Sequence, residues 1–146
     1  MKQCIFLFVI LMLTLVAFSN AQAQDIVGRW KTIDDETGKE KSIVNIYMQD
    51  GKYFGKIDTL FREPDEDPDP VCDKCPEDDP RYNKRIMGMV ILEDLEKDGD
   101  EWNDGSILDP GKGKVYDCKM WLEDGNLKVR GYLFFLYRTQ TWYRVD

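Results

Sequence analysis

Short turn sequences recur from Trp30 onward and separate segments rich in Val, Ile, Tyr, Phe and Trp. These residue types suit a pleated, half-buried strand, and Asp-Gly favours tight hairpins because both positions tolerate positive φ. The turn sequences are Thr37-Gly38, Asp50-Gly51, Asp98-Gly99, Asp104-Gly105, Asp109-Pro110-Gly111 and Asp124-Gly125. This spacing predicts an all-β chain of about eight antiparallel strands joined mostly by short turns.

The alternation of apolar and polar residues is clearest late in the chain. One apolar face there comprises Tyr116, Cys118, Met120 and Leu122. Residues 86–92 are apolar almost throughout, which predicts a buried strand. No segment after residue 23 shows a sustained helical period. Short links favour an up-and-down barrel, which leaves no exposed edge strands, and a two-sheet sandwich is the competing architecture.

The first 23 residues have the composition of an export signal. Lys2 is their only charge, residues 5–18 are nearly all apolar, and Ala21-Gln22-Ala23 offers small residues for cleavage. We expect cleavage after Ala23 and an exported domain over residues 24–146, with no stable membrane insertion after the signal is removed. A retained membrane anchor is the alternative, although the apolar run is short for a membrane span.

The chain is acidic, with a formal net charge of −8 at pH 7. Loss of Lys2 with the signal would make the exported domain more acidic by one charge. Because like charges repel, nucleic-acid phosphates and anionic membrane surfaces are disfavoured partners. We therefore expect no nucleic-acid partner and favour a basic or neutral one. The sequence identifies no protein partner.

The absence of histidine removes many catalytic mechanisms. Serine or cysteine nucleophiles paired with imidazole cannot be built, nor can histidine-ligated zinc or iron sites. Carboxylates, tyrosine, lysine and thiols remain, and Asp109 with Tyr116 is the least implausible pair. Asp109 already has an explanation as part of a turn. We predict a noncatalytic protein with no catalytic residue, cofactor or metal site, and an enzyme is only the third hypothesis.

Gly28-Arg29-Trp30 opens the first predicted strand and is suited to closing one end of a barrel. Glycine permits a sharp bend, and the indole ring would fill the interior. We expect Arg138 or Arg144 to stack on that ring and donate hydrogen bonds to nearby carbonyls. An ordinary core tryptophan is the alternative interpretation.

Arginines are interspersed with aromatic residues near the end of the chain. An inward arginine would pair with the carboxylate of an amphiphile, whereas an outward one would cover aromatic surface, the interpretation that we favour. The candidate ligand-binding residues are Trp30, Tyr116, Arg130, Arg138 and Trp142.

Residues 63–80 hold five prolines and nine carboxylates, which predicts an extended surface loop. The alternate carboxylates from Asp65 to Asp69 resemble a calcium loop. However, the central glycine is missing, and Pro76 stands where a bidentate glutamate is needed. A solvated acidic loop is therefore the favoured interpretation.

Cys72 and Cys75 lie within this acidic loop. A short-loop disulfide between them is favoured in an oxidising compartment. A thioredoxin-type redox pair and a zinc site that recruits Cys118 are the less favoured alternatives. Cys118 lies on an apolar strand face, which predicts a buried thiol, and a bridge from it to either loop cysteine stays open.

Read together, these segments resemble the bacterial family known as domain of unknown function 2147, from Gly28 nearly to the end of the chain. The resemblance implies a small exported protein, periplasmic or secreted, with a lipocalin-like barrel and no established activity. It supplies no catalytic residues. Family members often have glycine where this chain has Leu136-Tyr137. The matching segments are Gly28-x-Trp30, Thr37-Gly38-Lys39, Tyr53-x-Gly55-Lys56-Ile57, Cys72-x-x-Cys75, Trp102-x-x-Gly105-x-Ile107-x-Asp109-Pro110, Tyr116, Val129-Arg130-Gly131-Tyr132 and Arg138-Thr139-Gln140-Thr141-Trp142-x-Arg144.

The leading functional hypothesis is a noncatalytic carrier or sensor of a small hydrophobic or amphiphilic ligand. It requires a hollow barrel, because many eight-stranded barrels are filled by their own side chains. The competing hypothesis is a filled barrel that acts as a structural or protein-interaction module through the acidic loop of residues 63–80.

Overall fold

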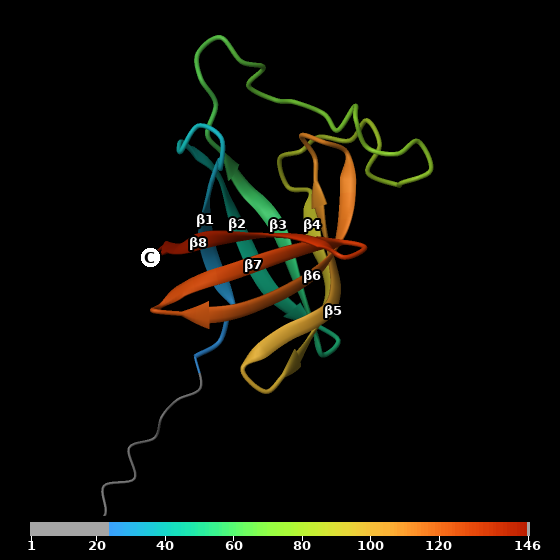
Figure 1. Ribbon diagram of the computed structural model, residues 1–146. Coiled ribbons are helices and arrows are strands. Elements are labelled where there is room, and N and C mark those ends of the chain that lie inside the picture. The colour runs from blue at the N-terminus through green and yellow to red at the C-terminus, as the bar shows by residue number, and fades with distance from the viewer. Residues whose placement is uncertain (1–23, 146) are drawn as a thin grey trace, which may run out of the picture.

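The computed structural model describes residues 24–145, and the predicted signal peptide of residues 1–23 lies outside this part of the chain. Eight antiparallel strands form one closed barrel in chain order, and β1 pairs with β8 to complete it (Figure 1). The strands are β1 (Gly28–Ile33), β2 (Glu40–Gln49), β3 (Lys52–Leu60), β4 (Val90–Asp98), β5 (Glu101–Asp109), β6 (Lys114–Glu123), β7 (Asn126–Leu133) and β8 (Leu136–Val145). The structure thus confirms the predicted barrel and rejects the two-sheet sandwich. In residues 24–145, no helix is long and apolar enough to cross a membrane.

Two of the hairpins have the turn chemistry predicted from Asp-Gly. Asp50 and Gly51 join β2 to β3 with φ angles of 51° and 79°, and Asp124 and Gly125 join β6 to β7 with 52° and 77°. Both central residues of each turn thus occupy the left-handed region that a two-residue hairpin requires. These turns fix the strand register, for example Glu123 opposite Asn126.

The prediction of a turn at Asp104-Gly105 is wrong, because both residues lie inside β5. Asp104 has a φ of 61°, and the pairing of β5 with β6 shifts register just before Gly105. A Cβ atom at Gly105 would collide with the carbonyl oxygen of Glu93 and approach Leu95. The dipeptide therefore marks a bulge where two strands pack closely, which requires the same backbone freedom as a turn.

The strand predicted over residues 86–92 also begins later than expected, at Val90. Ile86 to Met89 belong to the loop, where the Gly88 amide donates to the Ile57 carbonyl at 2.8 Å. Met89 is buried and Ile86 is partly buried against the core, whereas Met87 is exposed. The apolar run thus indicated burial for most of its residues, but it did not indicate where the strand begins.

Residues 61–89 connect β3 to β4 and include the predicted acidic segment, which is largely exposed. The disulfide between Cys72 and Cys75 is confirmed, and both cysteines are buried. Cys118 is a free, buried thiol, so the alternative bridge from Cys118 to the loop is not formed. The Cys72 sulfur lies 3.8 Å from the Pro110 carbonyl oxygen, so the disulfide packs against the β5–β6 turn.

The barrel core is formed by inward residues of all eight strands, including three fully buried tryptophans, Trp30, Trp102 and Trp142. Cys118 and Met120 of β6 point into it, as their predicted face requires. Burial of this apolar surface is the main stabilising contribution to the fold. The core does not fill the barrel to both ends, however, and this leaves the space described next.

Candidate functional site

A cavity of about 610 Å³ occupies the end of the barrel where β1 finishes and β2 begins. Its mouth is surrounded by the β1–β2 turn, the loop of residues 61–89, the β5–β6 turn and the β7–β8 hairpin. Its deeper wall is apolar and comprises Ile57, Ile91, Ile107, Leu108, Val129 and Trp142. The barrel is therefore hollow at this end, with an apolar wall beneath a charged rim.

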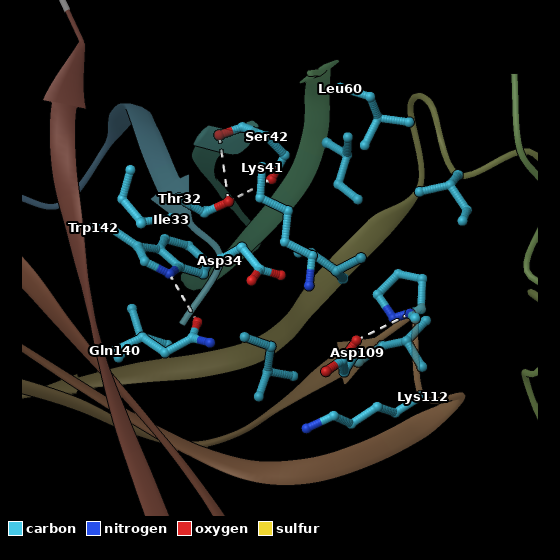
Figure 2. A pocket seen from close by; sticks show the side chains of 18 of the residues that line it. Thr32, Ile33, Asp34, Lys41, Ser42, Leu60, Asp109, Lys112, Gln140 and Trp142 are labelled. Atoms are coloured by element: carbon cyan, nitrogen blue, oxygen red, sulfur yellow. Dashed lines mark hydrogen bonds between the residues drawn. The ribbon is translucent and has the colours of Figure 1, made fainter. Parts of the chain in front are cut away.

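Several polar side chains within the cavity already have partners. The Thr32 and Ser42 hydroxyls are buried and lie 2.7 Å apart in a hydrogen bond (Figure 2). The Trp142 indole donates to the Gln140 Oε1 at 3.3 Å, and Gln140 Nε2 donates to Asp35 at 2.7 Å. Because these groups satisfy one another, an apolar ligand could enter without leaving them unpaired.

Ion pairs tie the rim of the cavity together. Lys39 on the β1–β2 turn contacts Glu63 at 2.8 Å, and Arg62 contacts Glu66 at 3.7 Å. The hydrogen bond between Lys39 and Glu63 raises the pKa of the lysine and lowers the pKa of the glutamate. Exposed pairs of this kind contribute little stability, but the Lys39–Glu63 pair connects the β1–β2 turn to the long loop.

Two rim aspartates are occupied by their own turns. Asp34 accepts hydrogen bonds from the backbone amides of Glu36 and Thr37 and from the Thr37 hydroxyl. The backbone and side-chain hydrogen bonds from Thr37 hold the pKa of Asp34 below its ordinary value. Asp109 accepts from the Gly111 amide at 3.0 Å, as expected for its turn. Both carboxylates thus have a local structural role.

Two lysines differ from the other rim cations. Lys41 and Lys112 line the cavity, and Figure 2 shows both side chains extending toward it. Neither forms an ion pair with a carboxylate of residues 24–145, whereas Lys39, Arg62 and Arg138 all do. Above the apolar wall, the rim therefore offers two lysines that form no ion pair within the described chain. The charge of Lys41 is partly balanced by Asp34, because it adds to the Thr37 hydrogen bonds that lower the pKa of that carboxyl.

The opposite end of the barrel, where β1 begins, is closed by Trp30. Its indole donates to the Ile26 carbonyl at 2.7 Å, and the Arg144 guanidinium lies 4.2 Å from the ring centroid. Arg144 also donates to the carbonyls of Val27 and Asp25 at 3.3 Å and 2.8 Å. The plug expected from Gly28-x-Trp30 is thus present, and Arg144 rather than Arg138 stacks on it.

The structure separates the predicted ligand-binding residues into two groups. Tyr116, Arg138 and Trp142 line the cavity, whereas Trp30 and Arg130 do not. Arg138 is paired with Asp35 at 2.9 Å. The Arg130 guanidinium lies over Trp121 and Tyr137, 4.9 Å and 4.3 Å from their ring centroids, on the outside of the barrel, as the outward alternative predicted.

Sequence reasoning missed Lys41 and Lys112. Lys41 lies one residue into β2, and Lys112 lies in the β5–β6 turn. Turn residues follow no hydrophobic period, so the pattern carries no signal of where the Lys112 side chain points. Near Lys41, the pairing of β2 with β3 shifts register between Ile43 and Val44, which interrupts the alternation. In the part of the chain that the structure describes, no group of three His, Cys, Asp or Glu side chains is arranged to hold a metal ion.

Comparison with known proteins agrees with the geometry. A family model described as "Uncharacterized protein conserved in bacteria (DUF2147)" matches residues 28–144. A search of curated proteins found no significant match. Among solved structures, protein HP1028 from the human pathogen Helicobacter pylori, described as belonging to the lipocalin family, superposes with a TM-score of 0.71 at 20% identity over 84% of each chain. This likeness shows a shared lipocalin-like fold.

Proposed function

The chain belongs to the bacterial DUF2147 family, and we propose that it is a noncatalytic carrier or sensor of a small amphiphile in the bacterial envelope. The observation that carries this proposal is the open cavity of about 610 Å³ with an apolar wall. Ligand pockets typically enclose about 300–1,000 Å³ and combine apolar walls with a few placed polar groups. A filled interior, the premise of the interaction-module hypothesis, is at odds with this space.

Lys41 and Lys112, the two rim lysines that form no ion pair within the described chain, indicate the polarity of the ligand. An acyl or similar apolar tail would occupy the deep wall around Ile91 and Trp142, while an anionic headgroup would lie near Lys41 and Lys112 at the mouth. A carboxylate or phosphate there would meet two lysines that form no ion pair within residues 24–145, of which Lys41 is partly balanced by Asp34. A neutral or cationic headgroup would gain no such contact.

Binding without catalysis is supported by the chemistry of the wall. The chain has no histidine to serve as a general base near neutral pH. Asp109 and Tyr116, the least implausible catalytic pair, both line the cavity, but Asp109 is held by the Gly111 amide. Export rests on the predicted signal peptide, and N-terminal sequencing of the cellular protein should find Gln24 as its first residue.

Titration calorimetry with dodecanoate tests the proposal. The wild-type protein should bind one molecule per chain, and dodecanol should bind more weakly because it lacks the anionic headgroup. Ile91→Phe, which places a larger side chain in the cavity, should weaken binding at least about tenfold. Lys41→Gln and Lys112→Gln should each weaken binding about three- to tenfold, a range set by a partly exposed charged hydrogen bond.

Lys56→Gln is the matched control. Lys56 is exposed on β3 and does not line the cavity, so its replacement should leave the affinity unchanged. Absence of dodecanoate binding to the wild type, or equal affinity of the Ile91→Phe variant, would contradict the proposal. Equal losses in the Lys56 and Lys41 variants would reject the headgroup assignment while leaving the cavity assignment standing.

A further inference from the structure

We infer that the tip of the β7–β8 hairpin is a docking surface for an anionic lipid bilayer. The tip consists of Phe134, Phe135, Leu136 and Tyr137. Its two phenylalanines are 91% and 88% exposed, far above the other large apolar residues of the described chain. Exposed apolar clusters on a small protein mark sites that contact a partner or a membrane. This inference concerns a partner and holds whether or not the cavity binds an amphiphile.

The tip is joined directly to the cavity. Leu133, Leu136 and Tyr137 line the mouth, while Phe134 and Phe135 extend beyond it. In Figure 1 the hairpin projects from the barrel, clear of the long acidic loop above it. Insertion of the phenylalanines among acyl chains would therefore bring the cavity mouth to the bilayer surface. A rigid two-residue turn can penetrate in this way without unfolding, because its strands stay paired.

Arg130 gives this hairpin a charge suited to an anionic surface. The chain as a whole is acidic. Of the four cations in residues 125–145, Lys128 and Arg138 are paired with carboxylates, and Arg144 lies at the closed end of the barrel. Near the tip, Arg130 forms no ion pair with residues 24–145 and lies over Tyr137, 4.3 Å from its ring centroid. An aromatic tip flanked by arginine matches the depth profile of a bilayer, where apolar rings enter and cations stay with headgroups. The remaining negative charge of the protein would keep this contact peripheral and reversible.

Folding alone does not account for the tip sequence. Phe134 adopts a φ of 57°, a left-handed conformation that glycine or asparagine occupies at less cost. The hairpins at Asp50-Gly51 and Asp124-Gly125 use the favoured residues at the equivalent positions. Phe134 thus adds backbone strain, and both phenylalanines add exposed apolar surface. A contact with lipid accounts for the presence of both phenylalanines at this turn.

Sedimentation with lipid vesicles tests the inference. Wild-type protein should bind vesicles of phosphatidylethanolamine and phosphatidylglycerol, and bind uncharged phosphatidylcholine vesicles more weakly. Combined Phe134→Gly and Phe135→Ser replacement supplies a dipeptide favoured where only the first turn residue has positive φ, so the fold should be kept or stabilised. This variant should lose at least about tenfold in vesicle affinity. Arg130→Gln should lose about fivefold on the anionic vesicles alone.

Met48→Ser is the matched control, since Met48 is 51% exposed on β2 beside the turn at the other end of the barrel. It should bind vesicles like the wild type. Wild-type protein that fails to bind anionic vesicles, or a tip variant that binds equally well, would overturn the inference. Concentration-dependent dimers without lipid that disappear in the tip variant would also overturn it, assigning the tip to a second copy of the chain.

Discussion

Replacement of Trp30 by phenylalanine tests the plug at the closed end of the barrel. The indole is fully buried and donates to the Ile26 carbonyl at 2.7 Å. Loss of that donor leaves a buried carbonyl unpaired, which costs about 1–3 kcal/mol. The smaller ring loses about 1 kcal/mol of packing, and Arg144 loses part of its cation–π contact, about 0.5 kcal/mol. The free energy of unfolding should therefore fall by about 3 kcal/mol.

Urea unfolding, followed by far-ultraviolet circular dichroism, measures this loss. With a typical slope of about 2 kcal/mol per molar urea, the midpoint should fall by roughly 1.5 M with the slope unchanged. The matched control is Trp121→Phe, because Trp121 is only partly buried beneath Arg130 and should lose less than about 1 kcal/mol.

Trp30 lies outside the cavity lining, so dodecanoate affinity of the folded Trp30→Phe variant should equal that of the wild type. Equal destabilisation of the Trp30 and Trp121 variants would refute the plug. Loss of dodecanoate binding in a folded Trp30→Phe variant would refute the separation of the closed end from the cavity.

Three further perturbations probe the loop and the core. Gly113 has a φ of 64°, and a Cβ atom there would collide with the Lys74 carbonyl. Gly113→Ala should therefore destabilise the protein by about 2 kcal/mol and speed proteolysis of the long loop, which limited trypsin digestion measures. The Cys118 thiol should resist alkylation at pH 8 until the protein unfolds, because burial raises its pKa to about 12; mass spectrometry after iodoacetamide treatment measures it. Asp79 is paired with Arg81, and hydrogen bonds from that arginine lower the carboxyl pKa. Because the pKa of this carboxyl is lower in the folded protein, its ionised form stabilises the fold at pH values above the unfolded pKa of about 3.9. Asp79→Asn should therefore lower the free energy of unfolding by about 1–2 kcal/mol at pH 7. The difference in urea midpoint between variant and wild type should vanish as the pH falls through the folded pKa.

The sequence predicted the barrel because its turn chemistry and strand alternation are local signals. Asp50-Gly51 and Asp124-Gly125 require positive φ at adjacent positions, and the structure has it. Asp104-Gly105 gave the same signal but forms a bulge. A turn and a bulge both need left-handed backbone, so only the pairing partner, which is distant in sequence, distinguishes them.

The cavity was harder to predict than the barrel. Trp142 and Tyr116, which we predicted to contact a ligand, both line the cavity, but whether they fill the interior depends on how four separate loops pack around the mouth. Alternation in β7 places Arg130 opposite the apolar face of Leu127 and Val129, whereas the face of Arg138 follows from its pairing with Gly131 across the β7–β8 hairpin. Arg138 consequently lines the cavity, while Arg130 lies outside.

The most direct test of the central claim, that the open end of the barrel holds one amphiphile, is a nuclear magnetic resonance titration of ¹⁵N-labelled protein with dodecanoate. The indole N–H signal of Trp142, which lines the cavity, should shift and saturate at one equivalent. The Trp30 indole signal, at the closed end, should stay in place. No saturable shift at Trp142, or equal shifts of both indoles, would contradict the account.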